Sequence, residues 1–130
     1  MNSLLTIIML SAFLSLTPIQ ALCDSVTYTC LYQTYADEKG VHNSEDDLKL
    51  VFTVDSSKGT AKIVSSDGKS DVNVDMIYSP SGGMAFIEKK SGADVLTTSI
   101  DERGKSVRSR NIIVDGQISP AQYYGRCTKK

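Results

Sequence analysis

Apolar and polar residues alternate along much of the chain with the period of two that is typical of β-strands. Residues 47–55 show this pattern most clearly, because one face carries Leu48, Leu50, Phe52 and Val54 while the other is mostly polar. Residues 71–78 repeat it, with an apolar face formed by Val72, Val74, Met76 and Tyr78. A single apolar face on each strand predicts antiparallel strands that cover one core.

Runs rich in β-branched and aromatic residues predict six further strands. They cover residues 25–32, 60–65, 84–89, 94–101, 105–114 and 117–127. In the run 84–89 both faces carry an apolar residue, so the pattern does not identify its inward face. Pro120 interrupts the last run and predicts an edge or a bulge there. The polar stretch 33–45 predicts the one long loop.

Turn signals separate these runs about every 10 to 14 residues. They combine Gly with Asp or Ser and lie at residues 55–59, 67–68, 79–83, 90–92, 101–104 and 115–116. The chain is therefore predicted to be all-β, with about eight short antiparallel strands in an up-and-down meander that closes into a small barrel. A two-sheet sandwich of the same strands is the alternative.

The first 23 residues predict a signal peptide, because an uncharged apolar run is followed by small residues. Cleavage after Cys23 places the small residues Ala21 and Cys23 where the peptidase requires them, whereas cleavage after Ala21 leaves Cys23 as an unpaired thiol. A lipid-anchored Cys23 is a further alternative. Residues 24–130 then form a single periplasmic or secreted domain, without an integral membrane segment.

Export to an oxidising compartment predicts a disulfide between Cys30 and Cys127. Such a bond would seal the seam where the last strand meets the first. Two cysteines and the single histidine, His42, do not suffice for a closed zinc site, so we expect no metal or other cofactor. The 15 acidic and 14 basic residues are evenly mixed, which argues against a nucleic-acid partner.

Candidate binding residues cluster near the end of the chain. Arg108 and Arg110 share a strand face and, together with Arg126, are candidates for a small anion site, although we expect ordinary arginines on the solvent face. Tyr123 and Tyr124 point to opposite faces, so one is expected to be exposed and available to a ligand or partner. We expect His42 to be a solvated loop residue and no residue to be catalytic.

Three segments carry a resemblance to small, uncharacterised exported bacterial β proteins that end in Gln-Tyr-Tyr-Gly-x-Cys. The segments are residues 97–101, 108–111 and 120–127. The chain also resembles bacterial inhibitors of c-type lysozyme, which are exported β-barrels of this size whose inhibitory loop carries Ser-Gly followed by Tyr. The matching positions are Ser81 and Gly82, but Phe86 follows in place of the Tyr.

These observations predict a non-enzymatic binding or interaction protein, because no catalytic motif stands out from the sequence. Its partner would be another protein or a small ligand. The alternatives are a lysozyme-inhibitor-like protein and a lipocalin-like carrier of a small apolar ligand. A carrier would need a lumen wider than eight tightly packed strands leave.

Overall fold

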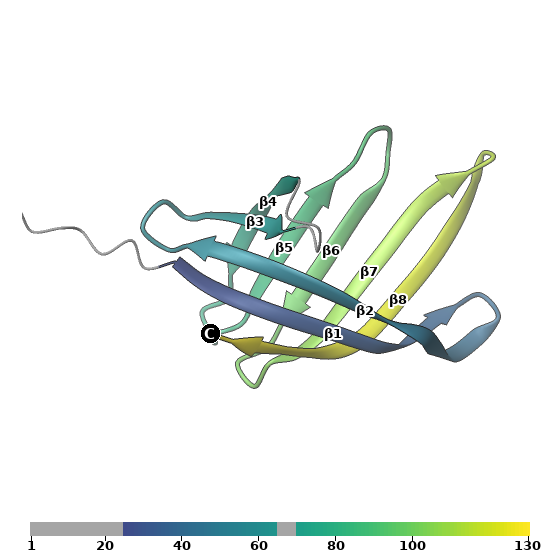
Figure 1. Cartoon of the computed structure of the whole chain (residues 1–130). Coiled ribbons are helices and arrows are strands. Elements are labelled where there is room, and N and C mark those ends of the chain that lie inside the picture. The colour runs from purple at the N-terminus through teal and green to yellow at the C-terminus, as the bar shows by residue number, and fades with distance from the viewer. Residues whose placement is uncertain (1–24, 65–69) are drawn as a thin grey trace, which may run out of the picture.

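Eight antiparallel strands form a closed barrel in the computed structural model, which describes residues 25–64 and 70–130. The strands are β1 (Ser25–Asp37), β2 (Gly40–Asp55), β3 (Thr60–Val64), β4 (Asp71–Tyr78), β5 (Met84–Lys89), β6 (Val95–Ile100), β7 (Lys105–Val114) and β8 (Gln117–Lys129). Each strand pairs with the next one in sequence, and β8 pairs with β1 (Figure 1). The predicted meander and its closure are confirmed, and the chain does not form the alternative sandwich.

The predicted signal segment, including Cys23, lies outside the described residues. No helix within the described residues has the length and apolar character needed to cross a membrane.

The inner face of the barrel follows the predicted alternation. On β2 the inward residues Phe52 and Val54 are fully buried, and their cross-strand partners on β3 are Ile63 and Ala61, respectively. The rings of Phe52 and Phe86 stack with their centroids 4.3 Å apart. These residues fill the end of the barrel at which β1 begins and β8 ends, which we call the termini end. Here the core is almost wholly apolar.

The seam between β1 and β8 is covalently closed. Cys30 and Cys127 are direct cross-strand partners and form a disulfide across a sequence separation of 97 residues. This confirms the predicted pairing. Two register positions further, Gly125 lies so close to the backbone oxygen of Leu31 that a Cβ atom would clash with it. A glycine is therefore required where the two strands approach each other.

The long loop predicted at residues 33–45 is wrong, because the strands continue through it. β1 extends to Asp37 and β2 begins at Gly40, so the two strands form one long hairpin with a register shift between Tyr32 and Thr34. Its residues are polar because, within the described part of the chain, the first half of β2 pairs with β1 alone. Polar and charged side chains are typical of such exposed sheet edges.

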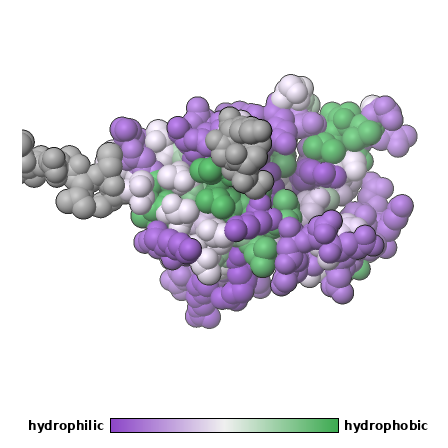
Figure 2. All heavy atoms as spheres, viewed as in Figure 1, coloured by the Kyte–Doolittle hydropathy of each residue, from purple (hydrophilic) through white to green (hydrophobic). Residues whose placement is uncertain are grey.

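The β7–β8 hairpin also projects beyond its neighbours. Its ladder continues to Val114 and Gln117, whereas the pairing of β8 with β1 stops at Gln122. Pro120 lies in this projecting part and faces no β1 partner, in agreement with the predicted edge position. Figure 2 shows apolar side chains near the tip of this hairpin, where Ile113 and Ile118 are exposed.

Candidate functional site

A charged layer crosses the barrel interior above the apolar core. Arg108 on β7 donates a hydrogen bond from Nη2 to Oε2 of Glu88 on β5 at 2.7 Å, and another from Nη1 to Oγ1 of Thr98 at 2.9 Å. The side chains of Arg108 and Glu88 are only 8% and 7% exposed. The expected position of Arg108 on the solvent face is wrong, because the barrel turns this face of β7 inward, where a carboxylate compensates its charge.

A neutral hydrogen-bonded chain lies beside the ion pair. The hydroxyl of Ser106 donates to the backbone oxygen of Ser99 at 2.9 Å. Because a serine hydroxyl has one proton, Tyr32 must donate to Oγ of Ser106, which lies 2.9 Å from its own hydroxyl. Burial raises the pKa of the Tyr32 phenol above its ordinary value. The described polar groups of this layer thus satisfy one another.

Beyond this layer the barrel opens into a cavity of about 320 Å³. It lies at the end opposite the termini end, and we call it the mouth. Its lining combines five apolar or aromatic residues with four charged ones: Leu48, Leu50, Ile63, Leu96 and Tyr123, and Glu88, Lys90, Arg108 and Arg110. The inward residues of β7 therefore lead from the ion pair into the mouth, since Arg110 is the next inward position after Arg108.

Arg110 differs from Arg108 in having no compensating carboxylate. Its cross-strand partners are Leu96 and Ala121, both buried. Its Nε atom is buried and has no hydrogen-bond partner, and no salt bridge links Arg110 to any carboxylate in residues 25–64 and 70–130. The mouth thus contains a guanidinium group that the described fold leaves without a counter-charge.

One wall of the mouth is continued by an aromatic stack on the β1–β2 hairpin. Tyr123 contacts Tyr35 with ring centroids 5.9 Å apart, and Tyr35 stacks on His42 at 4.9 Å. Nε2 of His42 lies 2.9 Å from Oδ1 of Asp37, and this hydrogen bond, with a second from the Lys39 amide, lowers the pKa of Asp37. The predicted loop position of His42 is therefore wrong, because His42 lies on β2, with its side chain 34% exposed.

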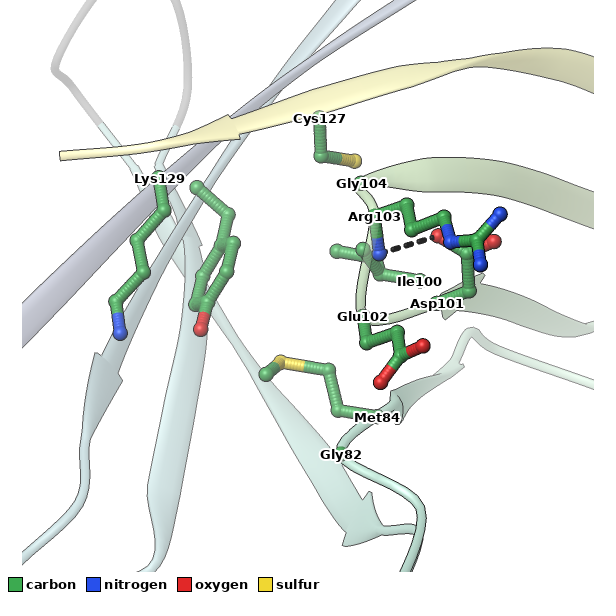
Figure 3. Close-up of a pocket in the computed structure, with 10 residues that line it drawn as sticks. Gly82, Met84, Ile100, Asp101, Glu102, Arg103, Gly104, Cys127 and Lys129 are labelled. Atoms are coloured by element: carbon green, nitrogen blue, oxygen red, sulfur yellow. Dashed lines mark hydrogen bonds between the residues drawn. The ribbon is translucent and has the colours of Figure 1, made fainter.

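A second cavity, of about 360 Å³, opens at the termini end (Figure 3). Lys129 of β8 and Glu102 of the β6–β7 turn lie on opposite sides of it, with Met84 between them. Its rim carboxylate Asp101 accepts hydrogen bonds from the amides of Arg103 and Lys105 at 2.9 and 2.7 Å. Asp101 thus holds the β6–β7 turn in place. Because this carboxylate is already engaged by the turn, we regard this cavity as the weaker candidate for a binding site.

The structure separates the six predicted binding residues. Only Arg108 and Arg110 reach the mouth. Arg126 points outward near the termini end and donates from Nη2 to the backbone oxygen of Arg103, so it does not join the other two arginines. Tyr124 faces outward with 39% exposure, and its hydroxyl donates a hydrogen bond to Oε1 of Gln122. Tyr123 faces inward, because it is the cross-strand partner of the inward residue Arg108.

Ser81 and Gly82 lie in the β4–β5 loop, away from the mouth. Gly82 lines the cavity at the termini end, where a Cβ atom added to it would contact Glu102. Phe86, which stands where the lysozyme inhibitors have their Tyr, is 1% exposed and belongs to the core. This aromatic side chain therefore points away from any surface on which an inhibitory contact could form.

Sequence reasoning missed Glu88, Lys90 and the leucines of the mouth. The signal that identifies Glu88 is its spacing from Phe86, which places both on one face of β5. Comparison of the chain with protein-family models, curated proteins and solved structures found no match. The candidate site therefore rests on its own geometry.

Proposed function

We propose that the chain is an exported, non-enzymatic protein that binds a small molecule in the mouth of its barrel. The observation that carries this proposal is the cavity of about 320 Å³ with a largely apolar wall and a few inward cations. Ligand sites in proteins are typically concave, mostly apolar and at least this large, with a small number of polar groups that orient the ligand.

Two further observations support the proposal. The disulfide is consistent with an oxidising compartment, and it agrees with the export expected from residues 1–23. The carboxylate of the mouth, Glu88, has Arg108 at 2.7 Å from one oxygen and Lys90 at 3.5 Å from the other. A carboxylate held by two cations is suited to fixing the shape of a binding site.

The proposal is tested with phenylnaphthylamine, an uncharged probe whose fluorescence rises in apolar sites. Wild-type protein is expected to bind it, and Leu48→Trp is expected to abolish binding because the larger ring fills the mouth. Leu31→Trp is the matched control, since Leu31 is an exposed leucine of β1. Native mass spectrometry of protein isolated from its own compartment is expected to reveal a retained small molecule. The proposal would be overturned if the isolated protein has the mass of the chain alone and Leu48→Trp binds the probe as well as the wild type does.

A further inference from the structure

The charges of the mouth do not balance. Its lining contains the cations Lys90, Arg108 and Arg110 and the single carboxylate Glu88, an excess of two positive charges. Both oxygens of Glu88 are already engaged by Arg108 and Lys90. Arg110 therefore carries a charge that no described side chain of the mouth neutralises.

The environment of Arg110 leaves one of its N–H groups buried and unsatisfied in the folded protein. Its cross-strand neighbours Leu96 and Ala121 are 4% and 7% exposed, and the buried Nε has no acceptor. A buried N–H group without a partner loses its hydration and gains nothing in exchange. An apolar residue at this position would avoid that cost, so the stability of the fold does not account for an arginine here.

We infer that the mouth binds a small amphiphilic anion, a molecule with one carboxylate or comparable acidic group on an apolar body. This inference rests on the proposed function. A guanidinium group offers a planar fork of N–H donors that matches a carboxylate or another oxyanion with two oxygens. The acidic group binds Arg110, and Lys90 at the rim adds a second positive charge.

The apolar body of the ligand contacts the apolar wall of the mouth. Leu48 and Leu50 of β2, Leu96 of β6 and the ring of Tyr123 supply this wall. The Glu88–Arg108 pair lies one inward position deeper along β7 than Arg110, and its two charges compensate each other. The site is therefore suited to acids whose apolar part fits a cavity of about 320 Å³.

The test compares two probes that differ by one acidic group, phenylnaphthylamine and its sulfonated form, anilinonaphthalene sulfonate. Arg110→Met keeps the length and apolar character of the side chain but removes its charge. It is expected to weaken binding of the sulfonate about tenfold or more, the loss of one charge-assisted contact, and to change binding of the neutral probe less than about threefold. Arg110→Lys is expected to retain part of the sulfonate affinity.

Arg126→Met is the matched control, because Arg126 points outward at the other end of the barrel and is expected to leave both affinities unchanged. Octanoate is expected to displace the bound sulfonate, and octanol, which lacks the acidic group, to displace it far less. Equal losses of both probes in Arg110→Met would overturn the inference about the anion, whereas the proposed function would survive if Leu48→Trp still blocks the neutral probe. Failure of wild-type protein to bind either probe would overturn both.

Discussion

The two halves of the barrel interior are built by the same inward alternation of residues and yet differ in chemistry. At the termini end, the inward positions hold Phe52, Val54, Phe86 and the Cys30–Cys127 disulfide, all of them buried. Toward the mouth, the inward positions of β5 and β7 hold Glu88, Arg108 and Arg110. The first half accounts for the stability of the fold, and the second half contains charges that a stable barrel does not require.

This difference supports our proposal that the charged residues toward the mouth are present for binding rather than for stability. A buried ion pair such as Glu88–Arg108 rarely stabilises a protein more than well-packed apolar residues of similar size would. An unpaired buried group such as Arg110 Nε is unfavourable for folding. Substitutions are therefore expected to lower the free energy of unfolding at Cys30, Cys127 and Glu88 but not at Arg110.

The largest effect is expected at the seam of the apolar half. Cys127→Ser, combined with Cys30→Ser to avoid a free thiol, removes a cross-link that spans 97 residues and is expected to lower the free energy of unfolding. The chain-entropy model gives about 4 to 5 kcal/mol for a loop of this length. Urea unfolding of the double variant measures the loss. Reduced wild-type protein should match the variant, and a midpoint identical to that of the oxidised wild type would contradict the structural role of the bond.

The second effect tests the charged layer. Glu88→Gln leaves the buried guanidinium of Arg108 without its counter-charge and is expected to destabilise the protein by about 3 to 5 kcal/mol. Asp75→Asn is the matched control, because Asp75 pairs with Lys89 on the solvent face and should cost less than about 1 kcal/mol. Similar costs for the two variants, measured by urea unfolding, would show that the layer is more hydrated than its burial implies.

A smaller, pH-dependent effect is expected at Tyr32. Its pKa is raised by burial, so the folded state holds the phenolic proton more tightly than the unfolded chain does. This contribution is complete below the ordinary tyrosine pKa near 10.0 and is lost as the pH rises through the higher pKa of the folded state. Tyr32→Phe should cost about 1 kcal/mol at neutral pH through the lost bond to Ser106.

The same variant should therefore lose less stability than the wild type between neutral and strongly alkaline pH. Urea midpoints across this range measure the difference. Tyr124→Phe serves as the control, because the Tyr124 hydroxyl bonds Gln122 on the outer surface. Parallel pH profiles for wild type and Tyr32→Phe would contradict the assignment.

The smallest effect is expected in the hairpin that carries the aromatic stack. Asp37 accepts hydrogen bonds from His42 and from the Lys39 amide, and these lower its pKa. Their contribution is present above the ordinary Asp pKa and is lost as the pH falls through the lower pKa of the folded state. Asp37→Ala removes the acceptor and should speed hydrogen exchange of the Lys39 amide while leaving the global unfolding midpoint unchanged. Unaltered exchange at Lys39 would show that the tip does not depend on this carboxylate.

The sequence was sufficient to predict the features that depend on local pattern. The alternation in residues 47–55 identified the inner face of β2, and the positions of Cys30 and Cys127 in the first and last strands identified the seam. The polar stretch 33–45 was misjudged because an exposed sheet edge has the composition of a loop. Local composition cannot separate these two structures.

The candidate site was harder to predict because its parts come from different strands. Arg108 was predicted on the surface because its ion-pair partner, Glu88, lies twenty positions earlier in the chain. The tight β6–β7 turn sets the register that places Thr98 opposite Arg108, so the inward direction of this arginine could have been inferred from the hairpin. The cavity itself depends on side chains of β2, β3, β5, β6, β7 and β8 together, and a pattern within one strand carries no information about it.

The central claim, that Arg108 serves the fold and Arg110 serves a ligand, is tested most directly by urea unfolding of two matched variants in the absence of ligand. Arg108→Met leaves Glu88 buried without its main partner and is expected to lower the free energy of unfolding by about 3 to 5 kcal/mol. Arg110→Met is expected to leave it unchanged or to raise it by about 1 kcal/mol, because an unpartnered buried N–H is removed. A loss of stability in Arg110→Met as large as that in Arg108→Met would contradict the claim.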